Sequence, residues 1–236
     1  MPSPRQLLHS LQRAARDRDF RRDLLWRRLP RPLGVFQISG DTSEDRYPRI
    51  FRFTRDALGE NPPARLLSFG CSTGEEVFTL RRYFPLARIE GIDINPYRIR
   101  TCRERLRREP DGGLNFTVTG STAHLPDASY DAIFCLAVLR HGGLQEGRAP
   151  RCDHLIRFAD FSALVADFAR CLKPGGLLAI AHSNFRFADT LTATAFEVVL
   201  HATPGKPRPQ TPLYGRDNRL LPGTIYRDVV FRKLGA

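Results

Sequence analysis

One stretch constrains the fold more than any other part of the chain: residues 65–95, RLLSFGCSTGEEVFTLRRYFPLARIEGIDIN. It begins with a short apolar run, which is typical of a strand buried on both faces. A turn with two glycines follows, then apolar residues at helical spacing from Glu75 to Phe84, and then a second apolar run from Arg88 to Ile92. This order of strand, turn, helix and strand predicts a βαβ unit with parallel strands.

The glycine turn is the first candidate binding site. Gly70 and Gly74 let the backbone approach a ligand closely, and the following helix presents unpaired N–H groups. Asp93 stands at the end of the second strand, 19 residues after Gly74. In nucleotide-binding βαβ units, an acid about 20 residues after the turn accepts hydrogen bonds from ribose hydroxyls. The spacing therefore predicts a ligand that contains a nucleoside; the alternative is an ordinary α/β turn with capping acids.

The composition of the turn distinguishes between cofactors. Residues 68–74 read SFGCSTG, which differs from the dinucleotide pattern G-x-G-x-x-G, and two glutamates follow. Carboxylates suit the positive end of a helix, but Glu75 and Glu76 repel a pyrophosphate. They favour a ligand that carries an ammonium and a sulfonium group. The turn therefore indicates S-adenosylmethionine rather than NAD.

Further motifs support a resemblance to a known family. The chain has SFGCSTGEE at 68–76, DIN at 93–95, IFC at 133–135 and LKPGG at 172–176. It resembles the class I S-adenosylmethionine-dependent methyltransferases over roughly residues 64–185. Within that superfamily its cofactor motifs are most similar to the chemoreceptor glutamate methyltransferase (CheR-type) branch, which has S-x-x-x-S-T-G-E-E in the turn.

The resemblance implies an α/β, Rossmann-like class I methyltransferase fold, with a mostly parallel twisted sheet, a terminal antiparallel strand and N-terminal capping helices. It also implies the cofactor site, in which Ser121 takes the place of an Asp that often accepts from the adenine amine. The residues expected to bind S-adenosyl-L-methionine are Ser68, Gly70, Ser72, Thr73, Gly74, Glu75, Asp93, Ile94, Ser121, Thr122, Ala123 and Leu136. We expect no metal site, because the sequence Cys152-Asp153-His154 alone is a weak pattern.

His141 is the candidate general base. In this superfamily the end of the fourth strand faces the transferred methyl group, and His141 follows that strand. His124 and His182 also follow strands, and the alternative role for His141 is turn formation or packing. The chemoreceptor branch continues with R-N-V-x-I-Y-F, whereas residues 136–142 here read LAVLRHG. The Arg, Asn and Tyr of that branch do not occur at these positions.

The rest of the chain predicts one cap and one domain. Residues 5–29 carry an apolar stripe opposite arginines, which predicts one or two amphipathic helices that pack on the domain rather than on a membrane. We expect residues 1–60 to form an N-terminal helical cap and residues 61–236 to form the cofactor-binding domain. Further helices are expected at 49–59, 96–108, 161–172 and, mostly, 185–200; strands are expected at 114–118, 132–136, 177–181 and 224–233.

Aromatic residues cluster in the segment that precedes the first strand. Phe36, Tyr47, Phe51 and Phe53 lie close together in the sequence, between the amphipathic helices and the βαβ unit. They suit either a substrate pocket or the core, and core packing is the expected role for most of them.

Composition limits the partners. The net charge of +12 comes almost entirely from arginine, which allows nucleic-acid binding. We favour the reading of an arginine-rich proteome, because the arginines do not alternate with aromatic residues as in RNA-binding modules. No apolar run is long enough to span a membrane, and the first 20 residues lack the apolar core of a secretory signal. The five cysteines form no C-x-x-C pair, which favours reduced thiols in the cytoplasm.

Three functions are consistent with these features. The leading hypothesis is an enzyme that methylates oxygen or nitrogen of a small molecule. The second is a methyltransferase that acts on a protein carboxylate or on RNA, and the third is a non-catalytic module that binds S-adenosylmethionine. A pocket closed by the N-terminal segment favours the first, and an open basic groove favours the second. The sequence does not predict the acceptor or the oligomeric state.

Overall fold

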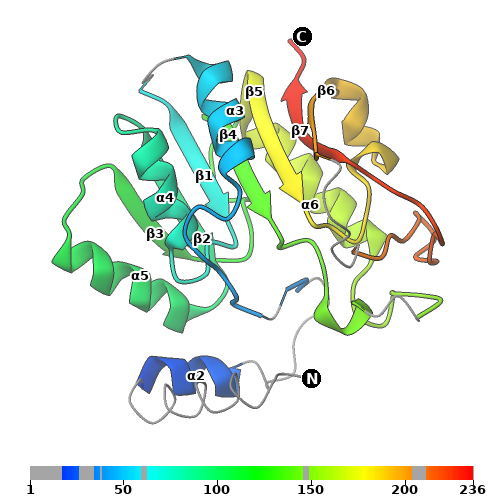
Figure 1. Cartoon of the computed structure of the whole chain (residues 1–236), viewed down its shortest axis with the longest axis horizontal. Helices are drawn as coiled ribbons and strands as arrows, with labels where there is room; N and C mark the ends of the chain where they lie inside the picture. The colour runs from blue at the N-terminus through cyan, green and yellow to red at the C-terminus, as the bar shows by residue number, and fades with distance from the viewer. Residues whose placement is uncertain are drawn as a thin grey trace.

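The computed structural model describes residues 18–26, 35–37, 39–59, 63–145, 149–203 and 211–235. Its centre is a seven-stranded sheet with the order β3-β2-β1-β4-β5-β7-β6. The five strands from β3 to β5 are parallel, and β7 and β6 add an antiparallel edge (Figure 1). This arrangement confirms the expected mostly parallel sheet with a terminal antiparallel hairpin.

From β1 to β5 the strands alternate with α-helices except between β3 and β4, and after β5 two 3-10 helices lead to the last two strands. The strands are β1 (Arg65–Phe69), β2 (Arg88–Asp93), β3 (Leu114–Val118), β4 (Tyr130–Leu136), β5 (Leu172–Ala181), β6 (Phe196–His201) and β7 (Asp228–Lys233). The α-helices are α2 (Arg18–Trp26), α3 (Pro48–Leu58), α4 (Glu75–Tyr83), α5 (Pro96–Arg108) and α6 (Phe158–Cys171), and three short 3-10 helices span Gly142–Leu144, Phe187–Asp189 and Leu191–Ala195.

Helices cover both faces of the sheet. Successive side chains of β1 point to opposite faces, and both faces are apolar. Leu66 packs with apolar residues of α3, α4 and α5, whereas Leu67 packs on the opposite face with residues of α6. Both side chains are fully buried, as expected for a parallel strand between two helical layers. The two layers leave the carboxyl ends of the strands as the edge where a ligand meets the sheet.

Most predicted elements are confirmed to within a few residues. The exception is 185–200, which we expected to be mostly helical. The structure has two 3-10 turns there and then strand β6, which pairs antiparallel with β7. The β-branched Val198 and Val199 suit a strand, and pairing with a segment some 30 residues later outweighs the local pattern. The predicted helices over residues 5–17 lie outside the described residues.

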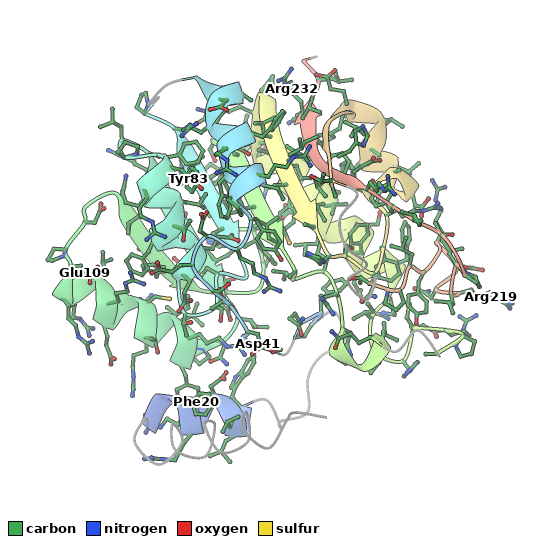
Figure 2. All side chains as sticks on the ribbon, viewed as in Figure 1. Phe20, Asp41, Tyr83, Glu109, Arg219 and Arg232 are labelled. Carbon is green, nitrogen blue, oxygen red and sulfur yellow. The ribbon has the colours of Figure 1, made fainter. Side chains whose placement is uncertain are left out.

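Two parts of the N-terminal region contact the domain: helix α2 and the segment that precedes α3. Helix α2 packs on α5, and Asp23 on α2 forms an ion pair with Arg98 at 3.1 Å. Residues 39–47 then run past the carboxyl ends of the central strands toward α3, and Asp41 lies in the region between α2 and the sheet (Figure 2). Across the described ranges, the structure contains no helix with the length and apolar character needed to cross a membrane.

Candidate functional site

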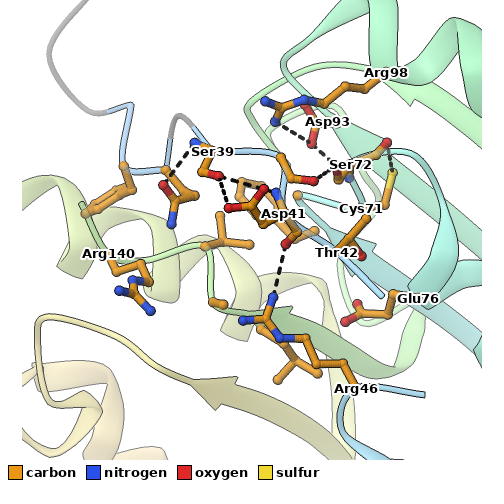
Figure 3. A pocket seen from close by; sticks show the side chains of 18 of the residues that line it. Ser39, Asp41, Thr42, Arg46, Cys71, Ser72, Glu76, Asp93, Arg98 and Arg140 are labelled. Carbon is orange, nitrogen blue, oxygen red and sulfur yellow. Dashed lines mark hydrogen bonds and ion pairs between the residues drawn. The ribbon is translucent and has the colours of Figure 1, made fainter. Parts of the chain in front are cut away.

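A cavity of about 260 Å³ lies at the carboxyl ends of β1, β2 and β4 (Figure 3). Three parts of the chain supply most of its lining: residues 35–37 and 39–47, the turn at 69–76, and residues 136–145. The remainder comes from the ends of β2 and β3 and from one residue each of α3, α5 and α6, which are Phe51, Arg98 and Leu164. The predicted cofactor turn and the end of the fourth strand therefore meet in one cavity.

Gly70 shows why the turn needs glycine. Its φ angle is +74°, a region that residues with a side chain rarely adopt. A Cβ atom at this position would lie 2.5 Å from the Cγ2 atom of Val138 in the loop after β4. The N–H groups of Gly70 and Cys71 both donate to the carbonyl of Ile92 on β2, at 2.8 and 2.9 Å. The turn is thereby fastened to β2 and packed directly against the loop that follows β4.

Asp93 is held at the end of β2 by the backbone. Its Oδ2 atom accepts from the N–H of Ser72 at 2.9 Å, and its Oδ1 atom accepts from the N–H of Asn95 at 2.8 Å. Burial raises its pKa, while Arg98 and the two backbone N–H groups oppose that rise. Each carboxylate oxygen offers about two acceptor positions, so both retain capacity for a ligand hydroxyl. The geometry suits an acceptor for a diol.

Helix α2 is connected to Asp93 by a buried network of hydrogen bonds and ion pairs. The Oδ1 atom of Asp23 accepts from Asn95 Nδ2 at 2.6 Å and from Arg98 Nε at 3.1 Å. Arg98 in turn lies 4.0 Å from the carboxylate of Asp93. The side chains of Asp23 and Arg98 are both more than 90% buried, so this network links the N-terminal helix to the predicted ribose acid.

Glu76, rather than Glu75, lies in the cavity. Its Oε1 atom accepts from the hydroxyl of Ser68 at 2.7 Å. Burial raises the pKa of Glu76 to about 7, although the Ser68 hydrogen bond and the positive charge of Arg46 oppose the rise. Glu75 turns away from the cavity and accepts from the Thr73 hydroxyl at 2.7 and 2.9 Å. Of the two predicted acids, only Glu76 is among the residues that line the cavity.

The predicted cofactor residues divide into those that line the cavity and those that support it. Five line it directly: Gly70, Ser72, Asp93, Ile94 and Leu136. Ser68 acts through Glu76, and Thr122 donates from its hydroxyl to Asp167 of α6. Thr73, Gly74, Glu75 and Ala123 are not among the lining residues. The role of each in cofactor binding stays a prediction.

Ser121 lies in an adjoining hollow. That hollow shares Phe36, Gly120 and Leu164 with the main cavity, so these three residues separate two adjacent spaces. The Oγ atom of Ser121 already accepts from the N–H of Ala123 at 3.1 Å. A hydroxyl can also donate, so Ser121 retains a hydrogen-bond donor in this hollow, and its role in adenine binding stays a prediction.

His141 lies beside the cavity and is not among its lining residues, although its neighbours Arg140 and Gly142 are. Its Nδ1 atom accepts from the N–H of Gly143 at 3.1 Å, which caps the short helix that follows. His124 is exposed, and the exposed His182 packs its ring 5.8 Å from Tyr47. The base role of His141 stays a prediction, next to an observed capping role.

Several lining residues escaped prediction. Arg46 and Arg140 come from segments 94 positions apart in the sequence, and only the folded chain brings both to one cavity. The aromatic cluster did give a signal, since Phe36, Tyr47 and Phe51 all line the cavity while Phe36 and Phe51 are also buried core residues.

The lining argues against a mechanism in which Cys71 acts as a nucleophile. Burial raises the pKa of the Cys71 thiol well above its ordinary value, so this cysteine is a neutral thiol near pH 7. A nucleophilic cysteine requires the thiolate. Within the described ranges, no group of three His, Cys, Asp or Glu side chains is placed to hold a metal ion.

Comparison with known proteins identifies one family model. Residues 67–180 match the model described as a methyltransferase domain. These residues run from β1 to nearly the end of β5 and contain the turn, Asp93 and the loop after β4. The match supports the class I S-adenosylmethionine-dependent methyltransferase resemblance and its Rossmann-like fold. It gives no support to the chemoreceptor glutamate branch.

Characterised relatives match over part of their length. The chain is 29% identical over 132 residues to malonyl-[acyl-carrier protein] O-methyltransferase 1 of Ilyobacter polytropus, covering 54% of this chain and 47% of that protein. It is 28% identical over 145 residues to demethylmenaquinone methyltransferase of Tropheryma whipplei, covering 58% and 52%. It is 33% identical over 132 residues to trans-aconitate 2-methyltransferase of Rhodopseudomonas palustris, covering 55% and 43%. The chain thus spans about half the length of these relatives.

Among solved structures, phosphoethanolamine N-methyltransferase 2 of Haemonchus contortus aligns with a TM-score of 0.47 and 16% identity, covering 76% of this chain and 35% of that one. Geranyl diphosphate C-methyltransferase of Streptomyces coelicolor aligns with a TM-score of 0.42 and 19% identity, covering 56% and 44%.

Proposed function

We propose that this protein is an S-adenosylmethionine-dependent methyltransferase that acts on oxygen or nitrogen of a small molecule. One observation carries the proposal: a single cavity brings the acid at the end of β2 together with a buried acid on α4 and a neighbouring arginine. Together these groups match the diol and the zwitterion of the cofactor. The methyltransferase match over residues 67–180 supports the same conclusion.

Asp93 fits the ribose. Its carboxylate is positioned by two backbone N–H groups and retains acceptor capacity, so it can accept from both ribose hydroxyls. Gly70, with its positive φ and missing side chain, lets the ligand approach the backbone next to this acid.

Glu76 and Arg46 fit the amino-acid end of the cofactor. The α-ammonium and α-carboxylate of a methionine share one carbon, so a site for them needs opposite charges close together. Glu76 and Arg46 both line the cavity, and the charge of Arg46 acts on the carboxyl of Glu76. We assign Glu76 to the ammonium and Arg46 to the carboxylate.

The protein's contribution to the reaction is binding, orientation and exclusion of water. The cofactor supplies an activated methyl group on a sulfonium, and transfer is an in-line displacement that depends on positioning. A base is required only where the nucleophile arrives protonated. Residues 39–47 support this role by crossing the ends of the strands, where the Ser72 hydroxyl donates to the Gly40 carbonyl at 2.9 Å.

The same segment favours a small acceptor over a macromolecule. Phe36 is buried in the core next to the cavity, and Gly40 is fastened to the cofactor turn, so residues 35–37 and 39–47 form a wall rather than an open groove. The names of the relatives include acids and a quinone precursor, which are small or carried groups.

The division into a cap at residues 1–60 and a domain at residues 61–236, and the cytoplasmic location, remain parts of this proposal. We do not extend it to receptor glutamates, since the R-N-V-x-I-Y-F sequence of that branch is replaced here.

A transfer assay tests this proposal against its alternatives. Protein and methyl-labelled S-adenosylmethionine are incubated with a cell extract that is then separated into small molecules, protein and RNA. We expect label in the small-molecule fraction, lost in the Asp93→Asn variant. Label in the protein or RNA fraction alone supports a macromolecular acceptor. Cofactor binding without label in any fraction supports the non-catalytic module.

A further inference from the structure

We propose that Arg140 is an anchor for an oxyanion on the methyl acceptor, so that the acceptor is a small molecule that carries a carboxylate. The inference rests on the proposed function and names the substrate class of the same cavity. Arg140 lies in the loop directly after β4 and is one of the residues that line the cavity.

The guanidinium of Arg140 is half-buried without a counter-ion. Its Nε atom is fully buried and has no hydrogen-bond partner among the described residues. Across the same residues, the guanidinium takes part in no hydrogen bond or ion pair. Burial lowers its pKa and the positive charge of Arg46 acts in the same direction, while the neighbouring Tyr47 opposes the fall. A buried, unpaired cation is costly, and the cost falls when an anion enters the site.

The acids of the cavity are engaged elsewhere. Asp93 accepts from two backbone N–H groups, and Glu76 accepts from Ser68. Asp41 accepts from the Ser39 hydroxyl at 2.7 Å, and Asp45 accepts from Tyr83 at 2.9 Å. None of the four forms an ion pair with Arg140, although the cavity contains four carboxylates. A ligand anion is therefore the remaining partner for this arginine.

Arg140 is also held in place by a buried residue. The N–H of Asn184 donates to the carbonyl of Leu139 at 2.8 Å, and its Oδ1 atom accepts from the N–H of His141 at 2.8 Å. Asn184 is 1% exposed and donates from Nδ2 to the carbonyl of Pro212 at 2.7 Å. The backbone on both sides of Arg140 is thus fixed to the segment after β5, which pre-organises the guanidinium for a ligand.

The cofactor's own carboxylate is the competing partner, and the geometry points away from it. That carboxylate shares a carbon with the ammonium, which we assign to Glu76. Figure 3 shows Arg140 and Glu76 on opposite sides of the cavity, with Arg46 between them. Arg46 is therefore the arginine next to the cofactor zwitterion, and Arg140 faces the part of the cavity that the acceptor occupies. A planar guanidinium binds a carboxylate through two parallel hydrogen bonds.

Calorimetric titration tests the anchor. The wild type is saturated with S-adenosylhomocysteine and titrated with acetate, malonate, succinate and citrate, and with malonamide and succinamide as neutral counterparts. We expect at least one carboxylate to bind and its amide not to bind. Arg140→Gln should weaken that carboxylate by at least about tenfold, and Arg140→Lys should retain part of the affinity. Arg88→Gln removes an exposed arginine at the start of β2, outside the cavity, and should change nothing.

The cofactor titration separates this inference from the proposed function. Arg140→Gln should bind S-adenosylhomocysteine within about twofold of the wild type, whereas Arg46→Gln should weaken it. The anchor is contradicted if the loaded wild type binds none of the carboxylates, or if Arg140→Gln binds them like the wild type. It is also contradicted if Arg140→Gln weakens S-adenosylhomocysteine but not 5′-methylthioadenosine, because Arg140 would then serve the cofactor's carboxylate. A folded wild type that binds no S-adenosylhomocysteine contradicts the proposed function itself.

Discussion

The cavity has two walls that are built in different ways. One, here called the cofactor wall, consists of the turn at 69–76 with Asp93 and Ile94; the other, here called the acceptor wall, consists of the residues within 39–45 and 137–142 that line the cavity. The cofactor wall comes from one βαβ unit, and its polar groups bond to one another: Asp93 to Ser72, and Glu76 to Ser68. The acceptor wall comes from two distant segments and leaves the guanidinium of Arg140 without a partner among the described residues.

The difference indicates a division of labour. A wall whose polar side chains hold one another in place is rigid and suits a ligand of constant shape, as a cofactor is. A wall with an unpaired cation awaits a ligand of opposite charge, as a specific substrate provides. Val138 joins the two walls, since it packs against Gly70 of the cofactor turn. Variants that act on one wall alone are the way to break or sharpen this comparison.

The largest effect is expected where the walls touch. Gly70→Ala places a Cβ atom at a φ of +74° and 2.5 Å from Val138. We expect it to lower the free energy of unfolding by about 3 kcal/mol, measured by urea denaturation, and to abolish cofactor binding. Gly112→Ala is the matched control, because a Cβ atom there meets nothing within 4 Å, and it should leave both quantities unchanged. Equal stability of the two variants would mean that the contact between the walls is loose.

Asp93→Asn tests the cofactor wall. The amide has one acceptor oxygen where the carboxylate has two, so it cannot serve Ser72, Asn95 and a ribose diol together. We expect S-adenosylhomocysteine affinity to fall about 100-fold in calorimetry, with the Arg140→Gln variant as the comparison from the other wall. A change below threefold would remove Asp93 from the ribose role.

The raised pKa of Glu76 leads us to expect that cofactor binding depends on pH. Burial raises its pKa to about 7, so the carboxyl is mostly neutral at pH 6 and mostly ionised at pH 8. Only the ionised form attracts the cofactor's ammonium, so affinity should rise with pH, by about tenfold from pH 6 to pH 8. Glu76→Gln should bind more weakly at pH 8 and show a flat profile. A slope that persists in Glu76→Gln would assign the titration to another group.

The smallest effect is expected at His141, which lies beside the acceptor wall and does not line the cavity. Its Nδ1 atom accepts from the Gly143 N–H, a bond that asparagine can also accept. His141→Asn should therefore keep the turn and reduce methyl transfer by less than about threefold. A loss of about 100-fold or more, with cofactor affinity unchanged, would establish the base role that the sequence suggested.

The two walls also differ in how far the sequence predicts them. The turn, Asp93 and the two parallel strands beside them follow from local spacing, because a βαβ unit places its glycines and its acid at fixed intervals. The choice between Glu75 and Glu76 did not follow, since it depends on which face of α4 points into the cavity. Arg46 and Arg140 line the same cavity only because distant segments meet in the folded chain, and no local sequence pattern predicts that contact. The predicted helix over 185–200 was wrong for the same reason. Strand β6 forms in that region by pairing with β7, a distant segment that the local pattern does not reveal.

One measurement tests the central claim most directly: calorimetric titration of the folded wild type with S-adenosylhomocysteine, with NAD as the comparison ligand. The account predicts micromolar binding of S-adenosylhomocysteine, one site per chain, and no binding of NAD, because Glu76 in the cavity attracts an ammonium and repels a pyrophosphate. Binding of NAD, or of neither ligand, would contradict the assignment of the cavity.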